Sequence, residues 1–422
     1  MLGTFRMLQA FRGRARWPVA TLQALQIRQL RQLVTHAYTQ VPFHRRRLAA
    51  MGITSETIRS LADVARLPTT SKDLIRDTPL AELVAAGVDP DRCDVVRTSG
   101  STGMPLRIVR GHYEIEWHRA AGLRIFRELG FRWTDRTFEI RAVLGQNFLV
   151  QRFGLAPKCW MSILEPPAEQ LRALVEFRPQ VVFAAASSLH DLAVTILDEG
   201  ITPPPVRLVI SDAESLLPTT RALVTRAFGV VPFDVYGLVE LSNFAWECER
   251  HEGLHVSADT HLVEIVDDDG SLPPGTPGRI VCTDLVARTM PMLRYETGDW
   301  GALVHDPCPC GRTFPRLVGL VGRAGDVIQL PDGRRLHWTY FHETFARFDE
   351  LERYQVIQEA LDRVRIRLLT RPERHRPLVD RLRAELATVI PDTVQLEFEA
   401  WNVELPDPAR KYRPVLSRVR LP

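Results

Sequence analysis

The spacing of apolar and polar residues divides the chain into stretches with different expected structure. In residues 1–90 apolar positions recur at helical spacing, most clearly over residues 23–38, and this predicts a mainly helical start. The run Pro-Thr-Thr-Ser-Lys-Asp at residues 68–73 predicts a loop that leads into a capped helix.

Residues 92–240 alternate short β-rich runs with helical stretches. Strands are predicted at 181–184 and 206–210, and helices at 189–199 and 219–228. This alternation favours a layered α/β core with parallel strands.

Residues 253–330 lose the helical periodicity. Two β-rich runs, at 263–266 and 278–281, lie on either side of the turn-forming residues Asp-Asp-Asp-Gly at 267–270. This pattern predicts hairpin-linked strands of a small antiparallel sheet.

The pattern changes again after residue 322. Helices are predicted at 342–348 and 376–389, and strands at 351–357, 363–369 and 394–399, which together form a compact α+β domain. Gly325 is the expected hinge before it.

We therefore expect an α/β protein with two domains. The N-terminal domain is placed at 1–323, with a helical start at 1–90, an α/β core at 91–250 and a small antiparallel β subdomain at 251–323. The C-terminal α+β domain is placed at 324–422.

Composition narrows the class of protein. The chain has 422 residues, of which 45% are hydrophobic and 25% charged, as in ordinary globular enzymes. Its formal net charge of +3 gives no reason to expect a nucleic-acid partner. No apolar run reaches the roughly 18 residues of a membrane span, and the first residues do not resemble a signal peptide, so a cytoplasmic protein is expected.

Two residue types are used in an informative way. Lysine occurs only at positions 72, 158 and 411, so each one is a candidate for a specific role. The six cysteines argue against a disulfide framework in a chain without a secretion signal.

Residues 98–105 read Thr-Ser-Gly-Ser-Thr-Gly-Met-Pro and carry the strongest chemical signal. Glycines admit positive φ and leave space, so backbone N–H groups and small hydroxyls can surround phosphate oxygens. The run lacks the Gly-Lys-Ser/Thr ending of a P-loop. Taken alone, such a run is more often a surface turn.

Four further segments place polar or aromatic side chains beside turns. They are Asp-Val-Tyr-Gly-Leu-Val-Glu at 234–240, Arg-Tyr-Glu-Thr-Gly-Asp at 294–299, Gly-Arg-Ala-Gly-Asp at 322–326 and Pro-Ala-Arg-Lys-Tyr-Arg at 408–413. With the loop at 98–105, this ordered set resembles the adenylate-forming superfamily, specifically its phenylacetate–CoA ligase-like branch, from about residue 65 to the end. The motifs are specific as a group, whereas each alone is weak.

The resemblance implies a two-step reaction that uses ATP, Mg²⁺ and coenzyme A. A carboxylate attacks the α-phosphate of ATP, which gives an acyl-adenylate and pyrophosphate. The C-terminal domain then rotates as a mobile lid, and a thiol, usually that of coenzyme A, displaces AMP. The acid is expected to be an aryl or other acyl carboxylic acid, although fold and motifs do not fix its identity.

The resemblance also assigns residues to the nucleotide. The loop residues expected to bind the β- and γ-phosphates are Ser99, Gly100, Ser101, Thr102 and Gly103. The adenine is bordered by Tyr236 and Gly237, together with Ala213, Glu214 and Asp234. The residues expected to bind the ribose hydroxyls are Asp299 and Arg323.

The catalytic set implied by the resemblance is Lys411, Thr102 and Glu240. Thr102 and Glu240 place the magnesium ion, and Lys411 bridges the carboxylate and the α-phosphate. Arg410 stands where the family pattern prefers glycine, so Lys411 is either this lysine or an ordinary exposed one. Gly325 likewise replaces the acidic hinge residue that is usual in the family.

The acid pocket is expected between the loop at 98–105 and the turn at 236–240. Its candidate walls are small and apolar side chains with a few polar ones, which suit an aryl or medium acyl group: Phe148, Ala184, Ala185, Ala186, Ser211, Leu238, Asn243 and Phe244.

Cysteines and a histidine on two separate turns indicate a structural zinc site. The expected ligands are Cys248, His251, Cys308 and Cys310, with His255 as a substitute for His251. Structural zinc favours four such ligands in a closed tetrahedron, and some ligases of the branch that this chain resembles carry such a site. The alternative is three reduced cysteines beside an unrelated histidine.

Two other functions stay open at this point. A stand-alone adenylating enzyme would pass the acyl group to an amine, a hydroxyl or a carrier-protein thiol without coenzyme A. An inactive nucleotide-binding homologue would bind ATP only, although intact Thr102, Glu240 and Asp299 argue against it. The resemblance also allows a homodimer.

Overall fold

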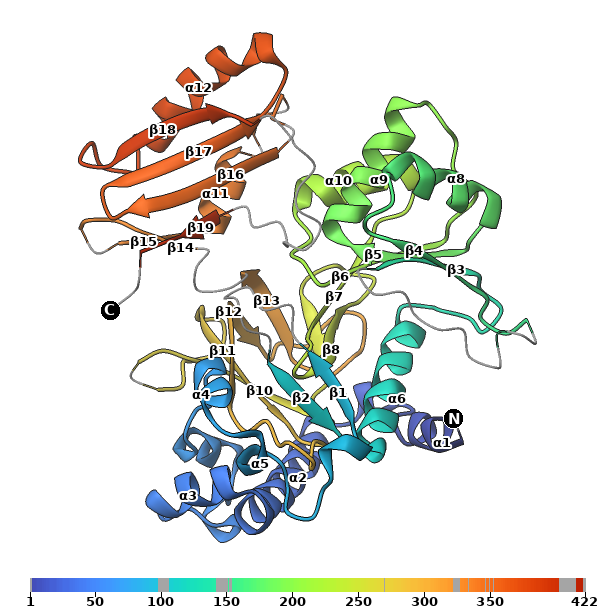
Figure 1. The fold of residues 1–422 in the computed structure, drawn as a ribbon, viewed down its shortest axis with the longest axis vertical. Helices are drawn as coiled ribbons and strands as arrows, with labels where there is room; N and C mark the ends of the chain where they lie inside the picture. The colour runs from blue at the N-terminus through green and yellow to red at the C-terminus, as the bar shows by residue number, and fades with distance from the viewer. Residues whose placement is uncertain are drawn as a thin grey trace. The chain divides into compact units, whose positions relative to one another are not determined.

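The computed structural model of the chain divides into two compact units, Met1–Leu216 with Leu223–Leu320, and Val321–Pro422 with Leu217–Ala222 (Figure 1). It describes residues 2–97, 106–141, 151, 154–268, 270–321, 327–332, 334–345, 347–348, 350–351, 353–401 and 415–419.

Within these residues the first unit contains one eleven-stranded mixed sheet, in the order β10-β11-β12-β13-β9-β8-β7-β6-β5-β3-β4. Its strands are β3 (Thr137–Arg141), β4 (Lys158–Ser162), β5 (Val181–Ala185), β6 (Leu208–Asp212), β7 (Phe233–Leu238), β8 (Ser242–Glu247), β9 (Leu254–Val256), β10 (His261–Val266), β11 (Gly278–Asp284), β12 (Tyr295–Val304) and β13 (Arg316–Val321).

Strand β7 joins the two halves of this sheet. It pairs parallel with β6 and antiparallel with β8. The antiparallel strands, which the sequence predicts as a small sheet, therefore continue the parallel sheet. The physical reason is the tight turn after β7, because a short hairpin connection can only produce an antiparallel neighbour.

Helices cover both faces of the parallel half. They are α6 (His112–Glu128), α8 (Pro167–Phe177), α9 (Ala186–Asp198) and α10 (Pro218–Phe228). On one face Leu171 and Leu189 of α8 and α9 share a buried cluster with Val182 of β5. On the other face Phe183 contacts Phe126 of α6, with ring centroids 5.0 Å apart. The alternation of side chains along β5 explains why one strand serves both faces.

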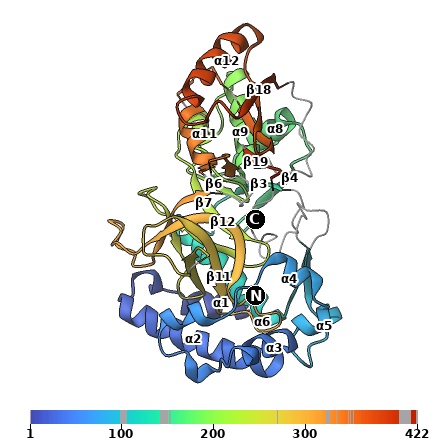
Figure 2. The ribbon, with the colours of Figure 1, turned by 90° about the vertical axis from the view of Figure 1, so that its left-hand side faces the viewer.

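The start of the chain is helical, as predicted. Its elements are α1 (Leu2–Ala10), α2 (Val19–Gln40), α3 (Pro42–Ala50), α4 (Lys72–Asp77) and α5 (Leu80–Leu83), with 3₁₀ turns at Arg14–Arg16, Ser55–Thr57, Leu61–Arg66 and Pro90–Arg92. Leu30 and Leu33 of α2 share a buried cluster with Leu262 of β10. Figures 1 and 2 both show α2 and α3 at the end of the unit that carries the antiparallel strands.

A separate hairpin precedes the sheet. Strands β1 (Asp94–Arg97) and β2 (Arg107–Arg110) pair antiparallel, with Arg97 opposite Arg107. Ile108 of β2 belongs to the same buried cluster as Leu241 and Tyr295. The hairpin is therefore anchored beside the turn between β7 and β8.

The second unit is α+β. Its described part has a four-stranded sheet in the order β18-β17-β16-β19 and the pair β14-β15. The elements are β14 (Val327–Gln329), β15 (Arg335–His337), α11 (Trp338–Phe345), β16 (Arg353–Ala360), β17 (Arg363–Leu369), α12 (Pro372–Leu386), β18 (Gln395–Ala400) and β19 (Val415–Ser417). Helix α12 begins earlier than predicted because Pro372 fits the first helical turn, where a missing N–H costs nothing.

No helix within the described ranges combines the length and the apolar character that crossing a membrane requires.

Candidate active site and cysteine–histidine cluster

Adjacent parallel strands bring three predicted site residues into register. Ala184 of β5 lies opposite Ser211 of β6, and Ser211 lies opposite Asp234 of β7. Ser211 is fully buried, and its hydroxyl has no hydrogen-bond partner among the described residues. Open α/β sheets bind ligands beyond the carboxyl ends of their strands.

The residues after β6 form a tight corner. Ala213 has φ 65°, in the left-handed region. Glu214 Oε2 accepts a hydrogen bond of 2.9 Å from the backbone N–H of Ser187, in the first turn of α9. The predicted adenine-border residues Ala213 and Glu214 are thus fixed to the end of β5, where Ala185 and Ala186 also lie.

Tyr236 and Asp299 come from distant segments and meet. The Tyr236 hydroxyl donates a hydrogen bond of 2.6 Å to Asp299 Oδ2. Burial, and next the nearby Asp299 charge, raise the pKa of Tyr236 well above its usual value. The phenol therefore stays protonated and remains a donor.

The β7–β8 hairpin sets the shape beside this pair. A Cβ on Gly237 would lie 2.5 Å from the backbone oxygen of Ser242, so only glycine fits there. Leu238 and Asn243 are half-buried. Phe244, by contrast, is fully buried between Tyr236 and His261.

Glu240 sits in the turn between β7 and β8, with only 5% of its side chain exposed. Tyr295, the first residue of β12, donates a hydrogen bond of 2.9 Å to Glu240 Oε1. Lys72 Nζ lies 3.6 Å from the same oxygen. The carboxylate is thus held by one phenol and one ammonium group.

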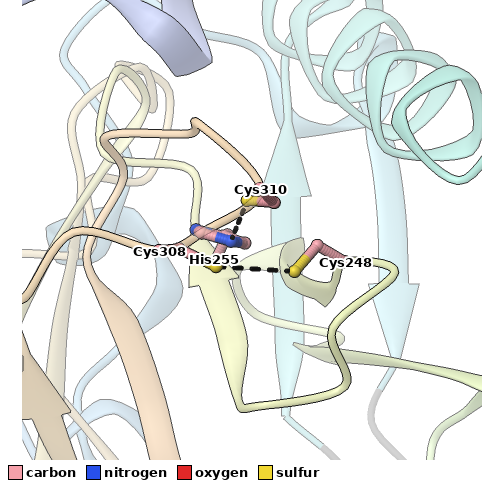
Figure 3. Close-up of side chains that lie close together, drawn as sticks. All are labelled: Cys248, His255, Cys308 and Cys310. Carbon is pink, nitrogen blue, oxygen red and sulfur yellow. Dashed lines mark hydrogen bonds between the residues drawn. The ribbon is translucent and has the colours of Figure 1, made fainter.

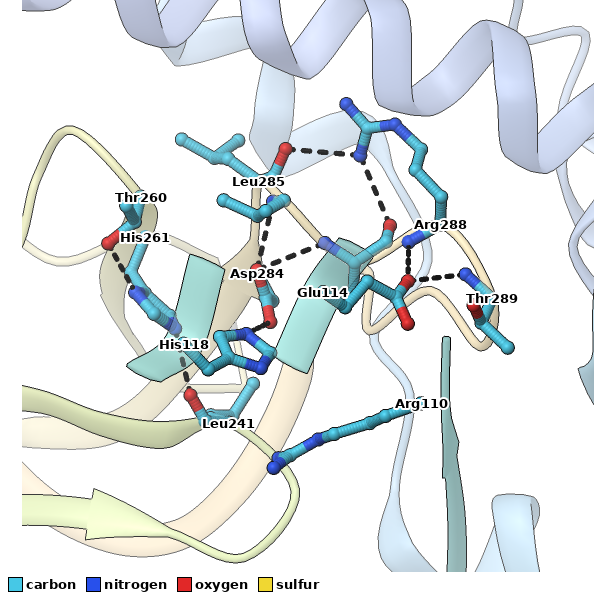
Figure 4. A network of polar contacts seen from close by, with 12 residues as sticks. Arg110, Glu114, His118, Leu241, Thr260, His261, Asp284, Leu285, Arg288 and Thr289 are labelled. Carbon is cyan, nitrogen blue, oxygen red and sulfur yellow. Dashed lines mark hydrogen bonds and ion pairs between the residues drawn. The ribbon is translucent and has the colours of Figure 1, made fainter. Parts of the chain in front are cut away.

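The backbone on both sides of Glu240 is held as well. Arg110 of β2 donates to the carbonyl of Val239, and His261 Nε2 lies 3.0 Å from the carbonyl of Leu241. Burial lowers the pKa of His261 to about 4, so the ring is neutral and Nε2 donates. Figure 4 shows the contact of His261 with Leu241 and, near it, the side chain of Arg110.

A second part of the same network ties α6 to β11. His118 Nε2 lies 2.8 Å from Asp284 Oδ2, and the backbone N–H of Val286 donates to Asp284 Oδ1 (Figure 4). Glu114 accepts from the backbone N–H groups of Arg288 and Thr289. These bonds fix the loop that precedes β12.

Several predicted site residues fall outside the described residues: Ser99, Gly100, Ser101, Thr102, Gly103, Phe148, Arg323 and Lys411. For the loop at 98–105, the structure places the two strands that flank it. The paired ends of β1 and β2 bracket residues 98–105 in the sequence, and Arg110 of β2 contacts the Glu240 turn.

Three cysteines and one histidine form a compact cluster: Cys248, His255, Cys308 and Cys310 (Figure 3). Their ligand atoms all lie within 4.8 Å of one another. His251, expected as the fourth member, is not part of it. Its Nδ1 lies 3.0 Å from Glu247 Oε2 and its ring packs on Phe233, whereas His255 on β9 faces the thiols.

The cluster geometry suits a tetrahedral metal ion. Cys248 Sγ and Cys308 Sγ are 3.8 Å apart, and Cys310 Sγ lies 3.3 Å from His255 Nε2. Zinc–sulfur bonds of about 2.3 Å at tetrahedral angles place two sulfurs about 3.8 Å apart. His255 Nδ1 donates to the carbonyl of Phe314 at 3.0 Å, which leaves Nε2 directed at the thiols.

Electrostatics around the cluster differ between its members. Burial raises the pKa of Cys248 to about 12 and lowers that of His255 to about 4. Burial also raises the pKa of Cys310, but hydrogen bonds from Arg312, Cys308 and Cys248 outweigh it and the net pKa is lowered. The neutral imidazole of His255 is suited to bind a cation.

Four residues contact the Glu240 carboxylate or the backbone beside it, and the sequence predicted this role for none of them: Lys72, Arg110, His261 and Tyr295. Tyr295 lies within the motif at 294–299, and the scarcity of lysine singled out Lys72. Arg110 and His261 act through backbone carbonyls, for which no residue pattern exists.

Comparison with known proteins supplies the family. No protein-family model matches the chain. A phenylacetate–coenzyme A ligase of Thermus thermophilus is 31% identical over 328 residues, covering 74% of this chain and 72% of that protein. A phenylacetate–coenzyme A ligase of Aromatoleum evansii is 28% identical over 326 residues, covering 73% and 71%. The chain belongs to the phenylacetate–CoA ligase family.

A solved structure confirms the predicted fold class of this family member. A 2-hydroxyisobutyryl-CoA ligase in its postadenylation state superposes with a TM-score of 0.79 at 21% sequence identity. The match covers 96% of this chain and 91% of that protein. The fold is therefore that of the adenylate-forming enzymes.

Proposed function

We propose that this phenylacetate–CoA ligase family member activates a carboxylic acid with ATP and transfers the acyl group to coenzyme A. The observation that carries the proposal is the convergence of two motif carboxylates. Asp299 accepts a hydrogen bond from Tyr236, and Glu240 accepts one from Tyr295. Tyr295 and Asp299 lie on the same strand, β12.

The Tyr236–Asp299 pair is the proposed adenosine site. A carboxylate accepts two hydrogen bonds from a ribose diol, and the bond from Tyr236 fixes its orientation. The same bond holds the Tyr236 ring in place as a border for adenine. Arg323 is proposed to contact the ribose as well.

Glu240 and Thr102 are the proposed magnesium ligands. A nearly buried carboxylate oxygen suits this hard ion, which prefers oxygen ligands. When bound, the ion offsets the triphosphate charge. The loop at 99–103 would hold the β- and γ-phosphates.

In the proposed reaction a carboxylate oxygen of the acid attacks the α-phosphorus, and the bond to the pyrophosphate oxygen breaks. Lys411 is proposed to stabilise the charge that builds up in this transition state. The sulfur of coenzyme A then attacks the acyl carbon, and AMP leaves with the bonding electrons. Residues 324–422 are proposed to be the lid that changes position between these steps.

An arylacetic acid is the proposed substrate class. The relatives are phenylacetate–CoA ligases, and the small side chain of the half-buried Ala185 at the end of β5 suits a ring beside it. The predicted wall residue Ala184, by contrast, is fully buried in the cluster formed with α8 and α9. Leu238 and Asn243 are proposed as the opposite wall.

We further propose that Cys248, His255, Cys308 and Cys310 hold a structural zinc ion. The donor set and its spacing support this assignment. The cluster connects the ends of β8 and β9 with the loop before β13, so the ion would fix the strand that follows the Glu240 turn.

The test is ATP–pyrophosphate exchange with a panel of arylacetic, benzoic and alkanoic acids, followed by coenzyme A. Acid-dependent exchange with thioester formation supports the proposal. Exchange without a thioester would indicate an amine, hydroxyl or carrier-protein acceptor. No AMP formation with any acid would indicate an inactive homologue.

Matched variants make this test specific. Glu240→Gln should abolish exchange, because it removes the metal-ligand charge. Glu56→Gln, the same change in an exposed turn, should leave it unaltered. Equal activity of both variants would exclude the assigned role of Glu240.

A further inference from the structure

Lys72 has a position that the proposed reaction does not explain. It is the first residue of α4, and its Nζ lies 3.6 Å from Glu240 Oε1. The lysine side chain is 25% exposed and that of Glu240 is 5% exposed. Lys72 is one of three lysines in the chain, and the only other one described, Lys158, pairs with Glu139.

The backbone that carries Lys72 is locked to the strand that carries Tyr295. The Thr70 N–H donates to the carbonyl of Arg294 at 2.8 Å, and the Glu296 N–H donates to the carbonyl of Thr70 at 3.0 Å. Thr70 and Tyr295 thereby form a parallel bridge. This bridge aims Lys72 and Tyr295 at the same carboxylate oxygen.

Arg47 and Ser71 fix this segment further. Arg47 donates to Thr70 Oγ1 at 3.0 Å, and Ser71 caps α4 by accepting from the Leu74 N–H at 3.2 Å. These contacts fix the backbone position from which the Lys72 side chain reaches Glu240. The pair therefore starts from a fixed segment of the chain rather than from a loose surface loop.

A carboxylate with so little exposure needs a counter-charge, because desolvation disfavours an isolated charge. Lys72, whose ammonium group lies 3.6 Å from Glu240 Oε1, supplies the direct pair, and the Arg110 guanidinium adds a second, less direct electrostatic contribution. A divalent ion that uses Oε1 would meet this ammonium group, and like charges at such a distance repel. The two cations are thus alternatives at one oxygen.

We propose that Lys72 is a positioning residue that serves as the resident counter-ion of Glu240 and must be displaced when metal binds. This inference rests on the proposed function, since it takes Glu240 as a metal ligand. Its consequence is that free metal binds weakly, whereas metal that arrives with a triphosphate, which supplies further oxygen ligands, can displace the lysine.

The first experiment measures Mn²⁺ binding to the nucleotide-free protein by the loss of the free-ion EPR signal. Lys72→Met should tighten Mn²⁺ binding by about tenfold, the size of one well-placed charge pair. Lys72→Arg should bind like the unmodified chain. The gain should disappear in Lys72→Met/Glu240→Gln. An unchanged affinity in Lys72→Met, or a gain that survives Glu240→Gln, would overturn the inference.

The second experiment uses no ligand. Urea unfolding of the two single variants and the double variant forms a thermodynamic cycle. Lys72→Met should lower stability, and Glu240→Gln should restore most of it. Lys158→Met is the matched control, and its effect should add independently to that of Glu240→Gln. Purely additive effects of Lys72→Met and Glu240→Gln would contradict a direct pair.

These readouts separate the inference from the proposed function. If the unmodified chain shows pyrophosphate exchange but the cycle shows no coupling, only the role of Lys72 fails. If it shows neither exchange nor Mn²⁺ binding in any variant, the proposed function and the metal competition both fail.

Discussion

Replacing Cys308 by serine tests the proposed zinc ion and what it stabilises. The cluster does more than join β8 to β9. Next to Phe314, whose carbonyl orients His255, Thr313 donates to the carbonyls of Ala15 and Trp17. Losing one ligand should therefore loosen both the loop at 308–314 and the N-terminal segment packed on it.

The size of the effect follows from binding linkage. A ligand present at 1,000 times its dissociation constant stabilises the folded state by about 4 kcal/mol. For a unit of about 300 residues the entropy of unfolding is about 0.65 kcal/mol/K, so each kcal/mol shifts the melting temperature by about 1.5 °C. Cys308→Ser should therefore melt about 6 °C lower, and a strong chelator should lower the unmodified chain to a similar temperature.

Three measurements check this. Elemental analysis should find about one zinc per chain, and much less in Cys308→Ser. Thermal melts with and without chelator report stability. Trp246, fully buried with its ring centroid 6.2 Å from that of His255, should show red-shifted emission when the cluster opens.

The control is Cys159→Ser, the same change at a half-buried thiol on β4 outside the cluster. It should keep its zinc and its melting temperature within about 2 °C, as most substitutions away from specific features do. A Cys308→Ser protein that retains stoichiometric zinc, or an unmodified chain that ignores the chelator, would refute the reasoning.

Three further predictions concern the nucleotide site and pH. Lys411→Ala should slow adenylate formation by about 10²–10³-fold and leave thioester formation from supplied acyl-AMP largely intact, measured as two separate half-reactions; equal losses would contradict its role. Tyr236→Phe should raise the KM for ATP by about tenfold with a small change in kcat, because it frees the Asp299 carboxylate, and an unchanged KM would exclude the adenosine assignment. Burial lowers the pKa of His44 to about 4, so the unfolded chain binds more protons between about pH 4 and 6.5, and stability is complete above this window and falls as pH drops through it. In urea unfolding, the titration of His44 should lower the free energy of unfolding by about 2 kcal/mol at pH 5 relative to pH 7.5. His44→Gln should reduce that pH dependence.

Regular patterns made some elements predictable. Strand β17 coincides with the predicted range 363–369, because its arginines alternate with Val364, Ile366 and Leu368, which are buried. Helix α6 was missed for the opposite reason. Its inward positions include Glu114, Glu116 and Arg124, each less than 5% exposed, so its apolar stripe is interrupted.

Those buried charges have partners that no local pattern reveals. Arg124 pairs with Asp259, and Glu114 accepts backbone N–H groups beyond β11. A charge that is satisfied by a residue more than a hundred positions away looks, in the sequence, like a solvent-exposed position.

The cysteine cluster shows the same limit at short range. His251 is the nearer histidine to Cys248, but it lies in a turn with φ 52° and bonds to Glu247. His255 lies on β9, opposite Arg316 of β13, and this pairing brings it to the loop that carries Cys308 and Cys310. Strand pairing, rather than proximity in the sequence, selects the ligand.

The turn at Glu240 combines contacts that the motifs identify with contacts that they do not. The motif at 234–240 identified the carboxylate, and the motif at 294–299 contained Tyr295, which holds it. The contacts that position the carboxylate are non-local. The Thr70 bridge places Lys72 beside it, and the hairpin of β1 and β2 places Arg110 at the neighbouring backbone. Because each of these contacts crosses between segments far apart in the chain, a substitution at Thr70 or Arg110 should disturb the proposed metal site as much as many changes within the motifs themselves.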